Sequence, residues 1–357
     1  MLNLNLTENI QMPDHKLRRD IVNLCQAIGK PILKLSTKDY LEHSLGHWIE
    51  QFGSAGLVNI EVFNQLQHTI TGWPGGKPNA DDTNRPERAK PFPKRVIVFS
   101  PHPDDDVISM GGTIRRLVQQ GNEVHIAYET SGNIAVNDEE FLRFMSFLKG
   151  YSWLTHQDIK TDVVPILAIK ALIRRGEAKL ACAYNGIDDK NIHFLNLPFY
   201  ESGQIEKLPM TERDVVPIEE LISTIQPHQI YVAADLADPH GTHKKCTDAV
   251  LAGIDEEKKA GAEWLKDCRV WMYRGAWAEW DVADIEMCVP MSPEELREKR
   301  NAILKHQSQM ESAPFLGNDE RLFWQRAEDR NRATAKKYDD LGLACYEAME
   351  AFVEYKL

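Results

Sequence analysis

The first part of the chain carries apolar residues at helical spacing. From about residue 14 they recur every three or four positions, as in Leu17, Ile21 and Leu24. This spacing places them on one face of an amphipathic helix, and it continues to about residue 71. We therefore predict a helical appendage over residues 1–71.

The next stretch favours neither helix nor sheet. Residues 72–94 hold five prolines and three glycines among charged residues. Proline lacks the backbone N–H that helices and sheets require, and both residue types are typical of turns. We therefore predict a linker over residues 72–94.

Beyond the linker, short apolar runs alternate with amphipathic stretches. This alternation is typical of an α/β fold with a Rossmann-like, mostly parallel sheet and flanking helices, which we expect over residues 95–291. The expected strands are Arg95–Phe99, Glu123–Thr130, Ile192–Leu195, Gln229–Ala233 and Arg269–Tyr273. The expected helices are Gly111–Gln120, Asn137–Lys149, Pro165–Tyr184, Val216–Ile225 and His243–Leu265.

The last part of the chain returns to a helical pattern. Ser292 suits the N-cap of a helix and Pro293 its first position. Glutamate and arginine pairs at helical spacing favour further helices over Arg321–Tyr338 and Leu343–Tyr355. We predict a helical tail over residues 292–357, packed on the α/β domain.

Composition narrows the class of protein. Hydrophobic residues make up 43% and charged residues 27%, close to the averages for soluble globular proteins. No apolar run reaches the length of a membrane span, and the first residues lack a secretion signal, so we expect a cytoplasmic protein without a membrane partner. A net charge of −12 would repel phosphate backbones, which argues against nucleic acid as a partner. The six cysteines form no C-x-x-C pair and so suggest neither a disulfide framework nor a thiolate zinc site.

Residues with metal-binding potential follow the first expected strand. The segment Ser100–Asp106 reads S-P-H-P-D-D-D, so one imidazole and three carboxylates lie together. Neither the G-x-G-x-x-G of dinucleotide-binding folds nor the Gly-Lys-Ser/Thr of a P-loop is present at this turn. A regular strand would place His102 and Asp104 on one face, whereas a turn bent by the two prolines could bring His102 and Asp105 together. Spacing alone does not choose between the two carboxylates.

A catalytic zinc site needs a third protein ligand and one open position. The sequence D-P-H-G-T-H, residues 238–243, follows the expected strand Gln229–Ala233. The carboxyl ends of parallel strands share one sheet edge, so both segments reach the same rim. His243 could then complete a site of two histidines and one carboxylate, with His240 nearby.

These motifs resemble those of a known family. The run V-I-V-F-S-P-H-P-D-D-D with G-G-T after it, and D-P-H-G-T-H downstream, are similar to the A-H-P-D-D-E and H-x-x-H signatures of the PIG-L/LmbE-like zinc-dependent de-N-acetylases. The resemblance extends over about residues 94–309, because T-S-G at 130–132, R-R-G-E at 174–177 and K-H-Q-S-Q at 305–309 also match family features.

The resemblance implies a role for each residue of the two motifs. It implies His102, Asp105 and His243 as zinc ligands, with Fe²⁺ and Co²⁺ as alternative metals. Asp104 would be the general base, and His240 would bind the oxyanion of the tetrahedral intermediate.

Three further residues are candidates for substrate binding. Asn133 stands where the family often has a glutamate after T-x-G. The guanidinium of Arg174 suits a phosphate group, and His306 belongs to the K-H-Q-S-Q segment.

A second likeness narrows the substrate. The helical lead-in, the proline-rich linker, N-L-P-F-Y-E-S-G and R-A-E-D-R-N-R resemble the carboxyl-terminal, de-N-acetylase-like half of long bacterial glucosamine-6-phosphate deaminases. The likeness implies hydrolysis of an N-acetylated amino sugar, such as N-acetylglucosamine or its 6-phosphate, with release of acetate. It also implies a fused or separate deaminase domain as partner. Two alternatives remain: a non-catalytic domain that binds metal and sugar beside a deaminase, and a metal amidase with a non-sugar substrate.

Overall fold

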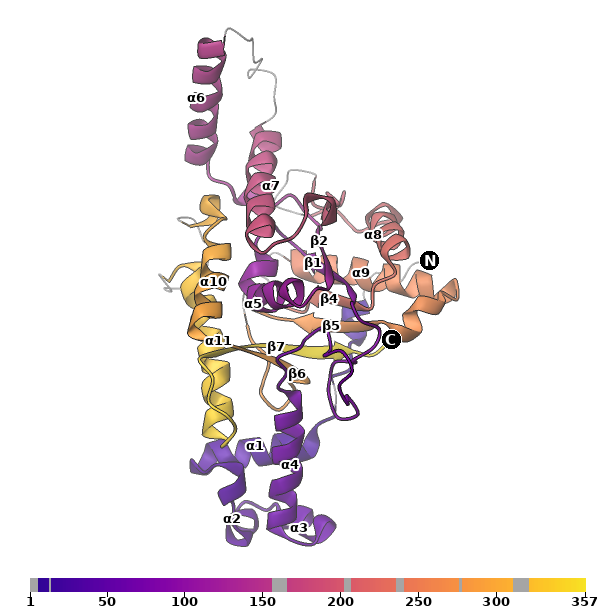
Figure 1. Ribbon diagram of the computed structural model, residues 1–357, viewed down its shortest axis with the longest axis vertical. Helices are drawn as coiled ribbons and strands as arrows, with labels where there is room; N and C mark the ends of the chain where they lie inside the picture. The colour runs from indigo at the N-terminus through magenta and orange to yellow at the C-terminus, as the bar shows by residue number, and fades with distance from the viewer. Residues whose placement is uncertain are drawn as a thin grey trace.

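A seven-stranded sheet forms the centre of the molecule (Figure 1). The computed structural model describes residues 6–12, 14–155, 166–201, 207–235, 241–275, 278–310 and 321–357. The strands are β1 (Arg95–Ser100), β2 (Glu123–Tyr128), β3 (Ile192–Phe194), β4 (Gln229–Ala233), β5 (Arg269–Tyr273), β6 (Met287–Met291) and β7 (Ala348–Tyr355). Their order is β3-β2-β1-β4-β5-β7-β6. Strands β1 to β5 are parallel, and β7 runs antiparallel to β5 and β6, so the predicted mostly parallel α/β fold is confirmed.

The helices fall into three groups along the chain. Those before the sheet are α1 (Lys16–Ile28), α2 (Thr37–Glu42), α3 (Gly46–Phe52) and α4 (Ala55–Thr69). Those between the parallel strands are α5 (Asp105–Gln119), α6 (Asp138–Thr155), α7 (Ile166–Tyr184), α8 (Glu212–Ile225) and α9 (Thr242–Lys259). Those near the end are α10 (Pro293–Ile303) and α11 (Phe323–Asp340). The predicted helix start at Ser292 is confirmed, because its side chain accepts from the Glu295 N–H at 3.2 Å in a capping box.

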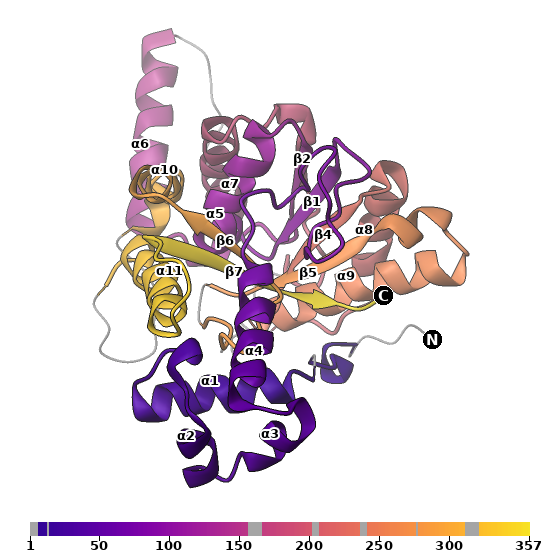
Figure 2. The ribbon, with the colours of Figure 1, turned by 60° about the horizontal axis from the view of Figure 1, so that its bottom comes forward.

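Alternating side chains of the strands build a core on each face of the sheet. In β1, Val96 and Val98 pack in one apolar cluster with residues of α5 and α7. Ile97 and Phe99 point to the opposite face and join a second cluster with residues of α8 and α9, as the two-residue period of a strand requires. Figures 1 and 2 show these helices on opposite sides of the sheet.

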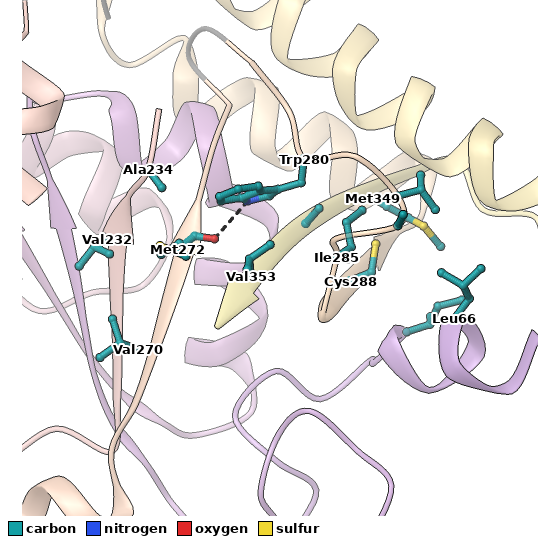
Figure 3. Close-up of a cluster of buried hydrophobic side chains, with 14 of the residues drawn as sticks. Leu66, Val232, Ala234, Val270, Met272, Trp280, Ile285, Cys288, Met349 and Val353 are labelled. Atoms are coloured by element: carbon teal, nitrogen blue, oxygen red, sulfur yellow. Dashed lines mark hydrogen bonds between the residues drawn. The ribbon is translucent and has the colours of Figure 1, made fainter. Parts of the chain in front are cut away.

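The amino-terminal helices share the second cluster. Leu66 of α4 is fully buried in it together with Cys288 of β6 and Met349 of β7. Figure 3 shows these residues near Trp280, whose indole N–H donates to the Met272 carbonyl at 3.2 Å. The predicted appendage is thus joined to the sheet by a continuous apolar core.

Residues 72–94 contain neither helix nor strand, as predicted. The segment is nevertheless held against the α/β part of the chain. The Gln229 side chain donates to the Pro74 carbonyl at 2.8 Å, and the Lys94 N–H donates to Asn122 Oδ1 at 3.0 Å.

The predicted helix over Leu343–Tyr355 is wrong. Residues Ala348–Tyr355 form strand β7, which fills the place between β5 and β6. Alanine, methionine and glutamate favour helices locally, but here tertiary packing outweighs that preference. Met349 and Val353 are buried on one face of the sheet and Phe352 on the other.

Candidate metal centre and active site

The site lies where the order of the strands reverses. Strand β1 is flanked by β2 and β4, and the chain leaves the carboxyl ends of β1 and β4 in opposite directions along the sheet. Such a point opens a crevice in which α/β proteins bind ligands. His102 lies in the turn after β1, Asp105 begins α5, and His243 is in the first turn of α9 after β4.

These three side chains converge. The ring Nδ1 of His102 is 3.0 Å from Asp105 Oδ2, and His243 Nε2 is 3.3 Å from the same oxygen. One ligand atom from each residue lies within 4.8 Å of the other two. Zinc–ligand bonds of 2.0–2.1 Å in a tetrahedron separate the ligand atoms by about 3.3 Å, so the donor set fits such an ion. The geometry also favours Asp105 over Asp104 as the carboxylate ligand, the choice that spacing had left open.

The electrostatic environment of the cluster suits metal binding. Burial alone would raise the pKa of Asp105, but the imidazoles of His243 and His102 lower it below its usual range. Burial lowers the pKa of His102, which outweighs the opposing effect of Asp105. An ionised carboxylate and a neutral imidazole are the forms that coordinate a metal.

Asp104 has a different environment from its neighbour. Its carboxylate oxygen is 3.2 Å from the Arg174 guanidinium, which also donates to the Pro103 carbonyl. Burial raises the pKa of Asp104 to about 8, although Arg174 opposes the rise. The backbone φ of Asp104 is 138°, a value that is rare for residues with a Cβ. Strain of this kind costs roughly 1–3 kcal/mol and clusters at active sites.

Asp106 supports the turn from behind. Its carboxylate accepts from the Tyr128 hydroxyl at 3.1 Å, and its N–H donates to the Ser100 hydroxyl oxygen at 3.1 Å. The Ser100 hydroxyl in turn donates to the His102 carbonyl at 2.6 Å. This network fixes the backbone from which His102 and Asp105 project.

The three substrate-binding candidates are all buried beside this turn. Asn133 follows Gly132, at which an added Cβ would lie 3.2 Å from the Arg174 guanidinium carbon. Both ring nitrogens of His306, Arg174 Nε and Nη1, and Asn133 Oδ1 have no hydrogen-bond partner among the described residues. Such buried polar atoms normally find a partner, so they are available to a ligand. His240 lies outside the described residues, and its role stays a prediction.

Two buried glutamates near the site were not predicted as site residues, although Glu177 belongs to the R-R-G-E segment noted in the sequence. Glu129 follows β2, and burial raises its pKa to about 8 in the vicinity of His243. Glu177 of α7 accepts from the Ser308 N–H at 2.6 Å and from its hydroxyl at 2.7 Å, which anchors the segment after His306. The position of Glu129 after a parallel strand was a usable signal, whereas the contact of Glu177 with Ser308 spans 131 residues.

Comparison with known proteins agrees with this site. Residues 97–254 match the family described as PIG-L, GlcNAc-PI de-N-acetylase. The match contains all three residues of the His102–Asp105–His243 cluster. The resemblance seen in the sequence is therefore confirmed over residues 97–254.

A longer relative and two solved structures are also similar to the chain. A glucosamine-6-phosphate deaminase-like protein of Bacteroides thetaiotaomicron is 64% identical over 371 residues, which cover 98% of this chain and 56% of the relative. The chain thus spans little more than half the length of that relative. The N,N'-diacetylchitobiose deacetylase of Pyrococcus horikoshii is 20% identical, with a TM-score of 0.49, over 73% of this chain and 83% of that protein. GalB of Pseudomonas putida, a 4-carboxy-2-hydroxymuconate hydratase, is 15% identical, with a TM-score of 0.48, over 74% of this chain and 97% of that protein.

No helix in the described part of the chain has both the length and the apolar character needed to cross a membrane.

Proposed function

We propose that the chain is a zinc-dependent hydrolase that removes the N-acetyl group of an amino sugar, N-acetylglucosamine or its 6-phosphate. The observation that carries the proposal is the His102–Asp105–His243 cluster with the buried Asp104 beside it. The family match supports de-N-acetylase chemistry, and the name of the longer relative supports an amino-sugar substrate.

In this proposal each residue has a defined task. His102, Asp105 and His243 would hold the metal, and a divalent metal there would act as a Lewis acid that polarises a carbonyl and lowers the pKa of water. Asp104 takes a proton from the attacking water, whose oxygen bonds to the amide carbon. The C–N bond then breaks and Asp104 returns that proton to the departing nitrogen, which leaves acetate and a free amine. His240 remains the proposed partner of the oxyanion.

Arg174 has two tasks in the proposal. Its guanidinium holds the strained turn through Pro103 and Asp104, and its Nε and Nη1 have no hydrogen-bond partner among the described residues and would bind substrate. Asn133 would add an acceptor, and the His306 ring, whose tautomer can adjust, would add a donor or an acceptor. A polyhydroxylated sugar presents the matching donors and acceptors.

Acetate release tests the proposal. Protein reconstituted with Zn²⁺ should release acetate from N-acetylglucosamine or from its 6-phosphate. Asp104→Asn should lower kcat/KM by about 10²- to 10⁴-fold, the range for loss of an acid–base residue, while metal content stays at the wild-type level. Acetate release by Asp104→Asn at the wild-type rate would refute the assigned role. Release from neither sugar, but from another acetamide, would point to a non-sugar amidase.

A second candidate function follows from the length of the relative. The chain spans 56% of a protein named for glucosamine-6-phosphate deaminase, so a domain that binds metal and sugar beside a deaminase is the alternative. Zinc and sugar binding without acetate release from any N-acetylhexosamine would favour this alternative over the hydrolase.

A further inference from the structure

Helix α5, which begins with the proposed ligand Asp105, is broken in its middle. Met110 has φ −141° and ψ 28°, values outside the helical region, so the helix consists of a first turn and a longer second part. A break of this kind frees backbone carbonyls at the end of the first turn and N–H groups at the start of the second part. The direction of the first turn sets where the Asp105 carboxylate points.

A fully buried glutamate from the last strand binds the freed N–H groups. Glu350 of β7 has no exposed surface. Its carboxylate accepts from the Gly112 N–H at 3.0 Å, the Thr113 N–H at 2.7 Å and the Thr113 hydroxyl at 2.6 Å. This carboxylate therefore caps the second part of α5 across 237 residues of sequence.

A buried lysine completes the arrangement from the other side of the break. Lys299 of α10 donates to Glu350 Oε1 at 2.7 Å and to Asn331 Oδ1 of α11 at 2.7 Å. Its ammonium is also 3.5 Å from the carbonyl of Ser109, the last residue before the break. The cation thus lies at a carbonyl end and the anion at an N–H end, which is the arrangement that the helix dipole favours.

The fit around the break leaves little room for another geometry. An added Cβ at Gly112 would lie 2.4 Å from Met291 Sδ, and one at Gly111 would lie 3.3 Å from Lys299 Cγ. The G-G after the acidic run therefore allows β6 and α10 to approach the broken helix closely. Helix α10, which carries Lys299, ends at Ile303, shortly before His306.

We propose that Glu350 and Lys299 are positioning residues of the metal centre: by bridging the break at Met110 they fix the first turn of α5, and with it the Asp105 ligand. The inference rests on the proposed metal site and adds the carboxyl-terminal strand to the parts that the site requires.

The test is the affinity for Zn²⁺ itself, measured by competition with a chromophoric chelator. Glu350→Gln keeps the size of the side chain but brings an amide N–H₂ towards donors, so the cap is impaired. We expect Zn²⁺ to bind about 10- to 100-fold more weakly, the range typical of residues that orient metal ligands. Glu354→Gln is the matched control, because Glu354 lies on the same strand and pairs with Arg269 of β5 rather than with α5. It should bind Zn²⁺ within about twofold of the wild type.

A milder variant protects the test against misfolding. Thr113→Val removes one of the donors to Glu350 without a change of shape, and we expect Zn²⁺ affinity to fall about threefold. Hydrogen exchange of the peptide that contains Gly112 and Thr113 should become faster in both α5-directed variants and stay unchanged in Glu354→Gln. Wild-type Zn²⁺ affinity in folded Glu350→Gln, or an equal loss in Glu354→Gln, would overturn the proposal.

Failure of the proposed enzyme would look different. If the wild type binds Zn²⁺ but releases no acetate, the deacetylase assignment fails while the positioning role is still tested by affinity. If the wild type binds no Zn²⁺, the metal centre itself fails, and the positioning role fails with it.

Discussion

Two buried carboxylates near α5 have different environments: Asp105, at the start of the helix, and Glu350 of β7, which caps its second part. Glu350 meets three donors from α5 and the Lys299 ammonium, so its charge is compensated and its hydrogen-bonding capacity is largely used. The carboxylate of Asp105 accepts a hydrogen bond from the backbone N–H of His102 at 2.9 Å. It also lies beside the imidazole rings of His102 and His243. Burial lowers the pKa of His102, while the two rings lower the pKa of Asp105 against the effect of its own burial.

This difference separates a structural charge from a functional one. A buried carboxylate with a complete set of donors stabilises one geometry. A buried carboxylate that meets two imidazole rings has partners that can themselves bind a metal, as its own oxygens can. The kind of partner, rather than burial alone, thus indicates which acidic residue carries chemistry.

The largest expected effect is on metal binding at Asp105. Asp105→Ala should weaken Zn²⁺ binding by at least about 1,000-fold, more than the 10- to 100-fold typical of residues that only orient ligands. The metal-free protein should also lose stability at neutral pH, because the two imidazoles hold the pKa of Asp105 below its usual range in the folded state. Chelator competition and urea unfolding of the metal-free protein give the two values. Wild-type affinity in Asp105→Ala would remove Asp105 from the metal centre.

The buried Lys299–Glu350 pair should affect the stability of the protein more strongly. Lys299→Met leaves Glu350 buried without its cation, and we expect the free energy of unfolding to fall by about 3–5 kcal/mol. The double variant Lys299→Met/Glu350→Leu removes both charges and should regain most of that stability, because apolar pairs often replace buried ion pairs at little cost. Urea unfolding of the metal-free proteins measures both changes. A double variant no more stable than Lys299→Met would show that the pair is not the source of the loss.

The sequence predicted the turn after β1 because its information is local. An apolar strand, a histidine and three acids lie within a few positions, and the parallel-strand rule brings His243 to the same edge. The geometry of Asp104 was out of reach, since its φ of 138° is held by Arg174, 70 residues away in the chain. The unmatched donors of Arg174 and His306 likewise follow from packing that no local pattern encodes.

Strand β7 shows the reverse case. Its alanines, methionine and glutamates favour a helix when taken alone, and Glu350 reads as a solvent-facing residue. The strand forms because β5 and β6 leave a place between them and because Lys299 meets Glu350 in the core. A charged residue at a core position of a central strand is an exception that sequence patterns argue against, so the error has a definite physical cause.

Lys94 is a third buried charged residue, and its partners are backbone carbonyls rather than a carboxylate. Lys94, before β1, donates to the Pro91 carbonyl at 3.1 Å and to the Arg88 carbonyl, and it forms no ion pair with a carboxylate in the described part of the chain. Burial lowers its pKa from 10.5 to about 8. Below pH 8 both the folded and the unfolded chain carry this proton. Between pH 8 and 10.5 the unfolded chain binds it and the folded chain does not, so the free energy of unfolding should rise with pH across this window.

The expected rise is on the order of 1–3 kcal/mol, smaller than the effect of breaking the Lys299–Glu350 pair. Lys94→Met should abolish it, and the difference between wild type and variant cancels the titration of cysteines and tyrosines in the same range. Urea unfolding at pH 7.5, 9 and 10 measures both proteins. If Lys94→Met showed the same pH trend as the wild type, Lys94 would not be the group that loses its proton. The backbone carbonyls around Lys94 would then stabilise its buried ammonium as well as a carboxylate does.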